Sequence, residues 1–243
     1  MYKYEISKRI ENFAPLETQE DWDCSGWAVD TKNNEHIHKI MLCLTPTNDV
    51  IKQAKSQNCD IIISHHPCFC IPIEWADINI YCAHTNLDKA KGGTTDTLIN
   101  TFLDLIQNLS QEEKIHIKNN IHYEEFLRIL KFEKPLSISE FSNIIRQISP
   151  NARLVNNHGI KGLKKIAFCA GSGSEFIQQA QTYGADCFVT GDLKFHTALD
   201  SEIAVYDIGH FESEVLVLPK IQEIIGDEAK IIIAKEKSPF EQI

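Results

Sequence analysis

The chain has no long apolar run and no excess of positive charge. None of its apolar runs is long enough to cross a bilayer, and its first ten residues lack the apolar core of a signal peptide. We therefore expect a cytoplasmic protein with no membrane partner. The net charge of −10 offers little attraction for a phosphate backbone, so nucleic acid is not an expected partner, whereas a small phosphorylated molecule remains compatible.

The eight cysteines include no Cys-x-x-Cys pair, and in a cytoplasmic protein we expect them to be thiols rather than disulfides. Three of them, Cys68, Cys70 and Cys82, lie close to the histidines described below. We favour a packing role for these three, with a thiolate metal ligand as the alternative. Four further cysteines lie in or beside apolar runs and are expected to be small buried hydrophobic residues. They are Cys43, Cys59, Cys169 and Cys187.

Strand and helix patterns alternate along the 243 residues, which predicts an α/β fold of one or two domains. The predicted strands are Lys39–Leu44, Asp60–His65, Asn79–His84, Arg128–Phe132, Arg153–Asn156, Lys165–Ala170, Asp186–Thr190, Ala204–Ile208 and Lys230–Ala234. The predicted helices are Ile6–Phe13, Asn48–Ser56, Thr94–Leu105, Ser137–Ser149, Ser174–Tyr183, Lys194–Ser201 and Glu212–Ile225. The residues from Ser110 to Glu125 are polar and aperiodic, and we interpret them as a linker or domain boundary.

Ile61–Pro67 is the most informative stretch, because a β-branched apolar run ends there in Ser64, His65, His66 and Pro67. Such a run predicts a buried strand that delivers two imidazoles to its carboxyl end, where α/β sheets bind ligands. Neighbouring strand residues point to opposite faces, so the two histidines are expected to serve two ions side by side rather than one. The alternative for this doublet is a polar loop tip.

Two further histidines are each followed by a carboxylate four residues later, as His84 with Asp88 and His210 with Glu214. Residues four apart share a face of a helix, so each pair is expected to project together. A carboxylate can bridge two ions, which completes the requirements of a dinuclear metal site. The nitrogen and oxygen ligands suit zinc, iron or manganese and do not choose among them.

If these residues share one site, the first domain must be discontinuous. We expect a metal-binding domain of residues 1–109 and 210–243 and a second domain of residues 110–209. Asp192 is interpreted as a helix N-cap, while Lys194 and His196 are open candidates for facing the site. The aromatic turn at Trp22–Trp27 is expected to pack, although an aromatic face near a metal site could also stack a flat base.

Taken in order along the chain, these motifs resemble the NIF-three-like family, a group of dinuclear-metal proteins also known as the GTP cyclohydrolase I type 2 family. The resemblance is carried by Trp22-Asp23, Ser64-His65-His66-Pro67, Ala83-His84-Thr85-Asn86-Leu87-Asp88, Thr190-Gly191-Asp192 with His196, and Asp207-Ile208-Gly209-His210 with Glu214. It implies two similar α/β domains in a homohexamer. Three departures from the family pattern are Cys24 in place of an asparagine, Thr45 in place of an aspartate, and cysteines at positions 68 and 70.

The resemblance implies that two divalent metal ions per subunit are held by His65, His66, Asp88, His210 and Glu214, with Glu214 as the bridge. It implies a GTP cyclohydrolase, a hydrolase that opens the imidazole ring of GTP to give dihydroneopterin triphosphate and formate. His84 would shuttle protons as the catalytic residue. Two alternatives stay open, namely a dinuclear-metal phosphoesterase and a non-enzymatic hexameric protein that binds metal or a partner.

Overall fold

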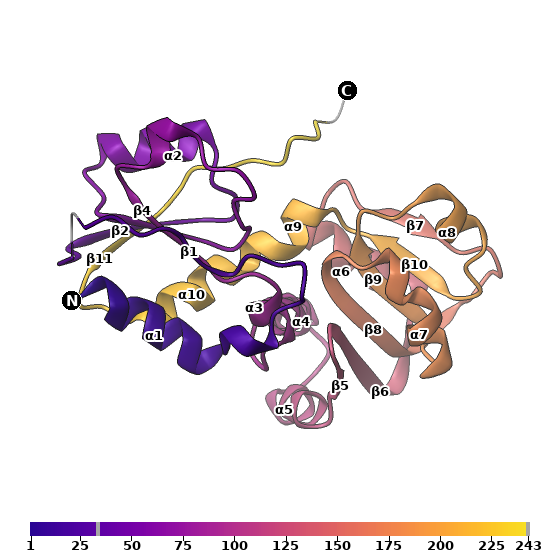
Figure 1. The fold of residues 1–243 in the computed structure, drawn as a ribbon. Helices are drawn as coiled ribbons and strands as arrows, with labels where there is room; N and C mark the ends of the chain where they lie inside the picture. The colour runs from indigo at the N-terminus through magenta and orange to yellow at the C-terminus, as the bar shows by residue number, and fades with distance from the viewer. Residues whose placement is uncertain (33–34, 242–243) are drawn as a thin grey trace. The chain divides into compact units, whose positions relative to one another are not determined.

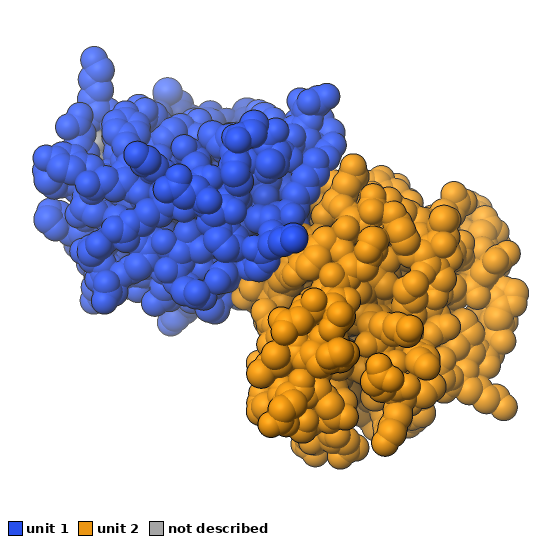
Figure 2. Space-filling view, turned by 90° about the horizontal axis from the view of Figure 1, so that it is seen from below, with its two compact units in different colours: residues 1–93, 217–239 blue, residues 94–216, 240–243 orange. Residues whose placement is uncertain are grey.

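The structure is a computed structural model that describes residues 1–32 and 35–241, and it divides into two compact units. Unit 1 comprises Met1–Gly93 and Val217–Pro239, and unit 2 comprises Thr94–Leu216 with the terminal segment from Phe240 (Figure 2). Each unit contains one sheet with helices packed on it, so the predicted α/β fold is confirmed. No helix in the described part of the chain is long and apolar enough to span a membrane.

Unit 1 is built on a five-stranded sheet in which four consecutive strands run parallel and one edge strand is antiparallel. In spatial order its strands are β1 (Gly26–Val29), β4 (Asn79–Cys82), β3 (Ile61–Ser64), β2 (Lys39–Cys43) and β11 (Lys230–Ile233), with β1 antiparallel to β4. Helix α2 (Asn48–Ser56) covers one face, and α1 (Lys3–Phe13) and α10 (Leu218–Ile225) cover the other (Figure 1). A parallel sheet covered on both faces needs apolar residues at successive positions, which explains the run Ile61-Ile62-Ile63.

The strand pleat divides this core between the two faces of the sheet. Met41 and Ile62 belong to a cluster with Val50 and Ala54 of α2. Their strand neighbours, such as Ile63, point to the opposite face and are fully buried as well. Because β2, β3 and β4 run parallel, their carboxyl ends lie at the same edge of the sheet of unit 1.

Unit 2 is built on a six-stranded mixed sheet. In spatial order its strands are β5 (His122–Glu124), β6 (Leu127–Ser137), β8 (Gly162–Ser172), β9 (Cys187–Gly191), β10 (Ala204–Asp207) and β7 (Arg153–Val155). Strands β8, β9 and β10 run parallel, and the remaining neighbours pair antiparallel. Helices α4 (Thr94–Leu105), α5 (Gln111–Asn119) and α6 (Ile138–Ile148) contribute to one core cluster, and α7 (Ile177–Thr182) contributes to another.

Short helical segments connect these elements. They are α3 (Thr85–Lys89), α8 (Phe195–Leu199) and α9 (His210–Glu214), with 3-10 turns at Leu16–Thr18, Ile73–Trp75, Ser174–Phe176 and Val215–Val217. All nine predicted strands and all seven predicted helical regions are present, with ends shifted by a few residues. Strands β1 and β5 were not predicted, because each is only three or four residues long and carries little periodicity.

The interpretation of Ser110–Glu125 as a linker is wrong, because this stretch contains α5 and β5. Ser110 and Glu113 form a capping box at the start of α5, with Glu113 N–H donating to the Ser110 hydroxyl at 3.2 Å. Ile117 on the same helix is buried in the core of unit 2. A cap and the burial of Ile117 therefore contribute to fixing a helix whose sequence is polar.

The residue ranges of the compact units differ from those of the predicted domains. The chain leaves unit 1 after Gly93 rather than after residue 109, and returns to it at Val217 rather than at residue 210. Helices α4 and α9 belong to unit 2 because both pack against β8 and against each other. Independent folding of these units as domains stays a prediction.

Candidate metal centre

His65 and His66 lie immediately beyond strand β3, which ends at Ser64. The alternation of strand side chains therefore does not apply to them, and the argument that they point to opposite faces is wrong. Their ring centroids lie 5.2 Å apart. The backbone turns at the strand end because the Ser64 hydroxyl donates to the His66 carbonyl oxygen at 2.9 Å. The two imidazoles of the doublet therefore lie next to each other at the end of the strand.

The chain brings a third imidazole to the same place through strand β4. His84 follows this strand, and its ring centroid lies 5.3 Å from that of His65 and 5.7 Å from that of His66. One ring nitrogen from each of the three histidines lies within 4.8 Å of the others. These three side chains, with Asp88, form what we call the unit 1 cluster.

Asp88 joins the cluster because His84 caps a short helix. The Asp88 N–H donates to the His84 carbonyl oxygen at 3.0 Å, which confirms the helical spacing predicted for this pair. Its carboxylate Oδ1 lies 3.4 Å from Nε2 of His65, whose side chain is fully buried. His65 Nδ1 lies 2.8 Å from the Ala83 carbonyl oxygen, and a carbonyl only accepts, so Nδ1 carries the hydrogen. In neutral His65 the Nε2 lone pair therefore faces a carboxylate oxygen, an arrangement that a shared cation stabilises.

The other imidazoles of the cluster are held in the same way, through Nδ1. His84 Nδ1 donates to Asp23 Oδ1 at 2.9 Å, and His66 Nδ1 lies 2.7 Å from the Thr45 hydroxyl. Histidines that bind metals through Nε2 typically use the other ring nitrogen for such a bond, which fixes the tautomer and the ring orientation. All three histidines of the cluster are therefore oriented for Nε2 to act as the ligand atom.

Asp23 accepts hydrogen bonds both from His84 and from the backbone at the start of α3. Its carboxylate also accepts hydrogen bonds from the Thr85 N–H at 3.0 Å, the Cys24 N–H at 2.7 Å and the Ser25 hydroxyl at 3.0 Å. Burial alone would raise the pKa of Asp23, but the bonds from His84 and Thr85 outweigh it and hold this pKa well below its usual range. Asp23 thus remains a carboxylate that accepts the Nδ1 hydrogen of His84.

Thr45 is positioned by a carboxylate from a distant part of unit 1. Glu236, which follows β11, accepts hydrogen bonds from the backbone N–H groups of Leu44 at 2.7 Å and Thr45 at 3.0 Å. Burial raises the pKa of Glu236, and these two bonds partly offset that effect. The hydroxyl that contacts His66 therefore sits on a backbone clamped at two consecutive positions.

Unit 2 carries the remaining predicted ligands, His210 and Glu214, which we call the unit 2 pair. Strand β10 ends at Asp207, and Gly209 with φ of 84° makes the turn that starts α9 at His210. His210 Nε2 lies 2.9 Å from Glu214 Oε2, which confirms that the pair projects together from one helix. A Cβ at Gly171 of β8 would lie 2.0 Å from Glu214 Oε1, so this glycine makes room for the carboxylate.

Asp192 orients His210 in the way that Asp23 orients His84. Its Oδ2 lies 2.7 Å from His210 Nδ1. Burial lowers the pKa of His210, but the bonds and charges of Glu214 and Asp192 more than compensate and raise it to about 9. The interpretation of Asp192 as a helix N-cap is wrong, because Lys194 is the N-cap of α8 and Asp192 has a positive φ of 52°.

The supporting residues Asp23, Asp192 and Glu236 were not identified as such from the sequence. Each contacts a group 18 or more positions away in the chain, so no local spacing reveals it. The one sequence signal was that Asp23 and Asp192 lie within motifs shared with the family. Thr45 was noted as a departure from the family pattern, and the structure shows that its hydroxyl makes the contact to His66.

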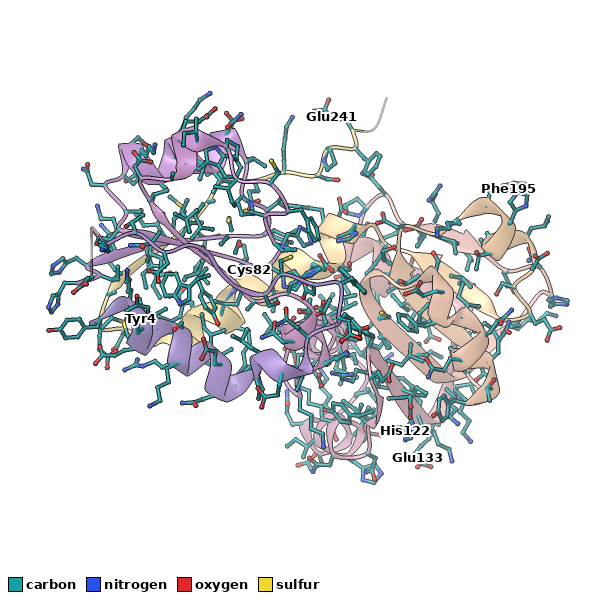
Figure 3. All side chains as sticks on the ribbon, in the orientation of Figure 1. Tyr4, Cys82, His122, Glu133, Phe195 and Glu241 are labelled. Carbon is teal, nitrogen blue, oxygen red and sulfur yellow. The ribbon has the colours of Figure 1, made fainter. Side chains whose placement is uncertain are left out.

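The open candidates for additional ligands do not join these groups. Cys70 is exposed, Cys68 is half-buried with a thiol pKa raised by burial, and the buried Cys82 donates to the His65 carbonyl oxygen at 3.0 Å. Among the described residues, no group of three that could hold a metal includes a cysteine. His196 is exposed on α8 beside Phe195, which projects away from its unit (Figure 3).

The donor set fits a divalent transition metal. Imidazole nitrogens and carboxylate oxygens are the ligands that zinc, iron and manganese accept, and the hydrogen-bond partners of Nδ1 match those of known metal-binding histidines. The predicted ligands fall into two preformed groups, one in each unit. The unit 1 cluster contains three imidazoles and a carboxylate, and the unit 2 pair contains one of each.

Curated relatives match the chain over nearly its full length. A protein of Clostridium perfringens, named GTP cyclohydrolase 1 type 2 homolog, is 32% identical and the match covers 98% of both chains. NIF3-like protein 1 of Drosophila melanogaster is 26% identical, over 97% of this chain and 87% of its own. These names are those of the relatives and carry no measured activity for this chain.

Solved structures share the fold. The structure of a Bacillus cereus protein related to NIF3 aligns with a TM-score of 0.82 at 20% identity, covering 100% of this chain and 99% of that one. Reduced HcgD from Methanocaldococcus jannaschii aligns with a TM-score of 0.78 at 27% identity, covering 96% and 97%. The family model Duf34/NIF3 (NGG1p interacting factor 3) matches residues 1–239. This chain therefore belongs to the Duf34/NIF3 family.

Proposed function

We propose that this protein is a metal-dependent hydrolase of the GTP cyclohydrolase type, which opens the guanine imidazole ring of GTP and releases formate. The observation that carries the proposal is the common orientation of His65, His66, His84 and His210. Each uses Nδ1 for a hydrogen-bond partner and so directs Nε2 to the ligand position. The names of the relatives supply the reaction class.

In this proposal the unit 1 cluster and the unit 2 pair bind two divalent metal ions in one centre. His65, His66, Asp88, His210 and Glu214 would hold the ions, and Glu214 would be the shared carboxylate, as the resemblance to the family implies. The ions are zinc, iron or manganese, and they would lower the pKa of water and polarise the substrate at the reacting carbon. The functional assembly is a homohexamer, as the resemblance to the family implies.

His84 is proposed to transfer protons rather than to bind metal permanently. Its Nδ1 hydrogen is held by Asp23, so the proton that exchanges is the one at Nε2. Asp23 thereby holds the ring so that Nε2 is the atom that takes up or releases a proton. Opening of an imidazole ring requires protons to move to the ring nitrogens, and His84 supplies a group suited to that transfer.

Two assays on one metal-loaded preparation test this function. Incubation with GTP is expected to release formate and to give a pterin that becomes fluorescent after oxidation. Release of phosphate without pterin would replace the proposal with a phosphoesterase. Retention of metal without either product would indicate a protein that binds metal or a partner without catalysis. His84→Gln is expected to retain metal and lose product formation, while His158→Gln, on an exposed loop, serves as the matched control.

A further inference from the structure

Trp22 differs from the other two tryptophans of this chain in its exposure. Its side chain is 60% exposed, whereas Trp27 is half-buried and Trp75 is 7% exposed, with Trp75 Nε1 donating to Asn48. Leaving a large aromatic ring in water forgoes the free energy of its burial. An exposed tryptophan beside a group of candidate ligands is therefore a candidate contact for a bound molecule.

Trp22 lies directly beside the unit 1 cluster. Its ring centroid is 5.9 Å from that of His84, with the two planes at 75°. In an edge-to-face pair one ring presents its edge, so at most one face of the indole is occupied by His84. No other aromatic ring in the described part of the chain contacts Trp22. At least one face of the indole thus remains accessible next to His84.

The backbone that carries Trp22 is fixed before any ligand binds. The next residue, Asp23, closes a turn with its N–H donating to the Glu20 carbonyl oxygen at 3.0 Å, and its side chain is bound to α3 and to His84. A side chain on a fixed backbone loses less entropy on binding than one on a mobile segment. Trp22 is therefore attached to a fixed backbone beside the proposed proton-transfer residue.

We propose that Trp22 is a stacking platform for the planar ring of the substrate, a purine nucleotide. The inference deepens the proposed function, on which it rests for the identity of the ligand. The charges of the turn support a ring rather than a phosphate at this position, because Asp21 and Asp23 would repel a triphosphate, whereas Glu20 is paired with Lys89. The base then lies against Trp22 beside His84, and the triphosphate extends away from the turn.

Nucleotide binding to Trp22 variants measures the effect directly. Base stacking on an aromatic side chain corresponds to about a 5- to 150-fold change in affinity. Trp22→Leu, which keeps an apolar side chain without a ring, is expected to weaken GTP binding by that factor in calorimetry, and Trp22→Phe is expected to restore most of it. Inorganic tripolyphosphate, which has no ring, is expected to bind wild type and Trp22→Leu equally.

Tryptophan fluorescence provides a second readout that does not depend on catalysis. GTP is expected to quench the wild-type protein and Trp27→Phe, and to have little effect on Trp22→Phe. Equal GTP affinity of wild type and Trp22→Leu, quenching that persists in Trp22→Phe, or absence of GTP binding would each overturn the proposal. Formate release together with wild-type GTP affinity in Trp22→Leu would reject the stacking role and support the proposed reaction. GTP binding that depends on Trp22 but yields no formate would support the stacking role and reject the proposed reaction.

Discussion

Replacing Thr45 by valine exchanges the side-chain hydroxyl for a methyl group of similar size. That hydroxyl lies 2.7 Å from Nδ1 of His66 and is the partner that orients this imidazole. Loss of such a supporting bond typically lowers metal affinity by about 10- to 100-fold, or about 1.4 to 2.7 kcal/mol. The cost to folding is expected to be smaller, about 1 kcal/mol, which is the net contribution of a typical hydrogen bond.

Competition between the protein and a chromophoric chelator measures the affinity, and denaturant unfolding of the metal-free protein measures the stability. Thr45→Ser keeps the hydroxyl and is expected to bind metal nearly as well as wild type. Thr101→Val is the matched control, because the Thr101 hydroxyl bonds only the Thr97 carbonyl oxygen within α4. Wild-type metal affinity in Thr45→Val would refute the assignment of His66 as a ligand oriented through Nδ1.

Three further outcomes are expected. Glu236→Ala releases the clamp on the Thr45 backbone and should lower metal affinity by up to about tenfold in the same competition. Asp96→Asn leaves the fully buried Arg128, 2.9 Å away, without its counter-charge and should cost about 3–5 kcal/mol of unfolding free energy. Burial and, next in size, the bond to Asp96 raise the pKa of Tyr123 to about 12. The contribution of Tyr123 to the free energy of unfolding is therefore complete below pH about 10 and is lost toward pH about 12. Tyr123→Phe should abolish this alkaline loss of stability.

Each of these three has its own contradicting result. Unchanged affinity in Glu236→Ala would mean that the backbone clamp does not position the hydroxyl. Asp96→Asn unfolding within about 1 kcal/mol of wild type would mean that Arg128 finds another partner or water. An alkaline stability profile of Tyr123→Phe that coincides with wild type would show that other groups control unfolding there.

The parts of the fold with strong local signals were predictable from the sequence. Helix α2 occupies the predicted residues Asn48–Ser56, because the Thr47 hydroxyl caps it and Val50, Ile51 and Ala54 bury one face. Helix α9 begins at His210, two residues before the predicted start at Glu212, because Gly209 with φ of 84° makes the turn. In both cases a terminus is set by one or two neighbouring residues, so the chain itself contains the information.

The supporting residues of the candidate centre were not predictable in this way. Asp23 reaches His84 across 61 positions and Thr45 reaches His66 across 21, so their roles exist only after the strands have paired. The predicted orientation of the His65–His66 doublet was wrong for a related reason. Strand β3 stops one residue earlier than predicted, and the pleat that would separate the two rings ends with it.

The unit boundaries depend on packing between elements that are distant in the chain. His210 was predicted to belong to the first domain because the candidate ligands were expected to share one site, whereas α9 packs on β8 and α4 in unit 2. A polar segment such as Ser110–Glu125 carries no sign of the buried Ile117 contacts that hold α5. Such assignments follow from tertiary contacts and not from periodicity.

Metal content is the most direct test of the central claim, that the histidines and carboxylates of the unit 1 cluster and of the unit 2 pair are metal ligands. Elemental analysis of the purified protein should give two divalent ions per chain. His65→Ala, in unit 1, and Glu214→Ala, in unit 2, should each lose metal, while His158→Ala should retain it. Full metal content in both site variants, or a wild-type protein that binds no divalent metal, would contradict the account.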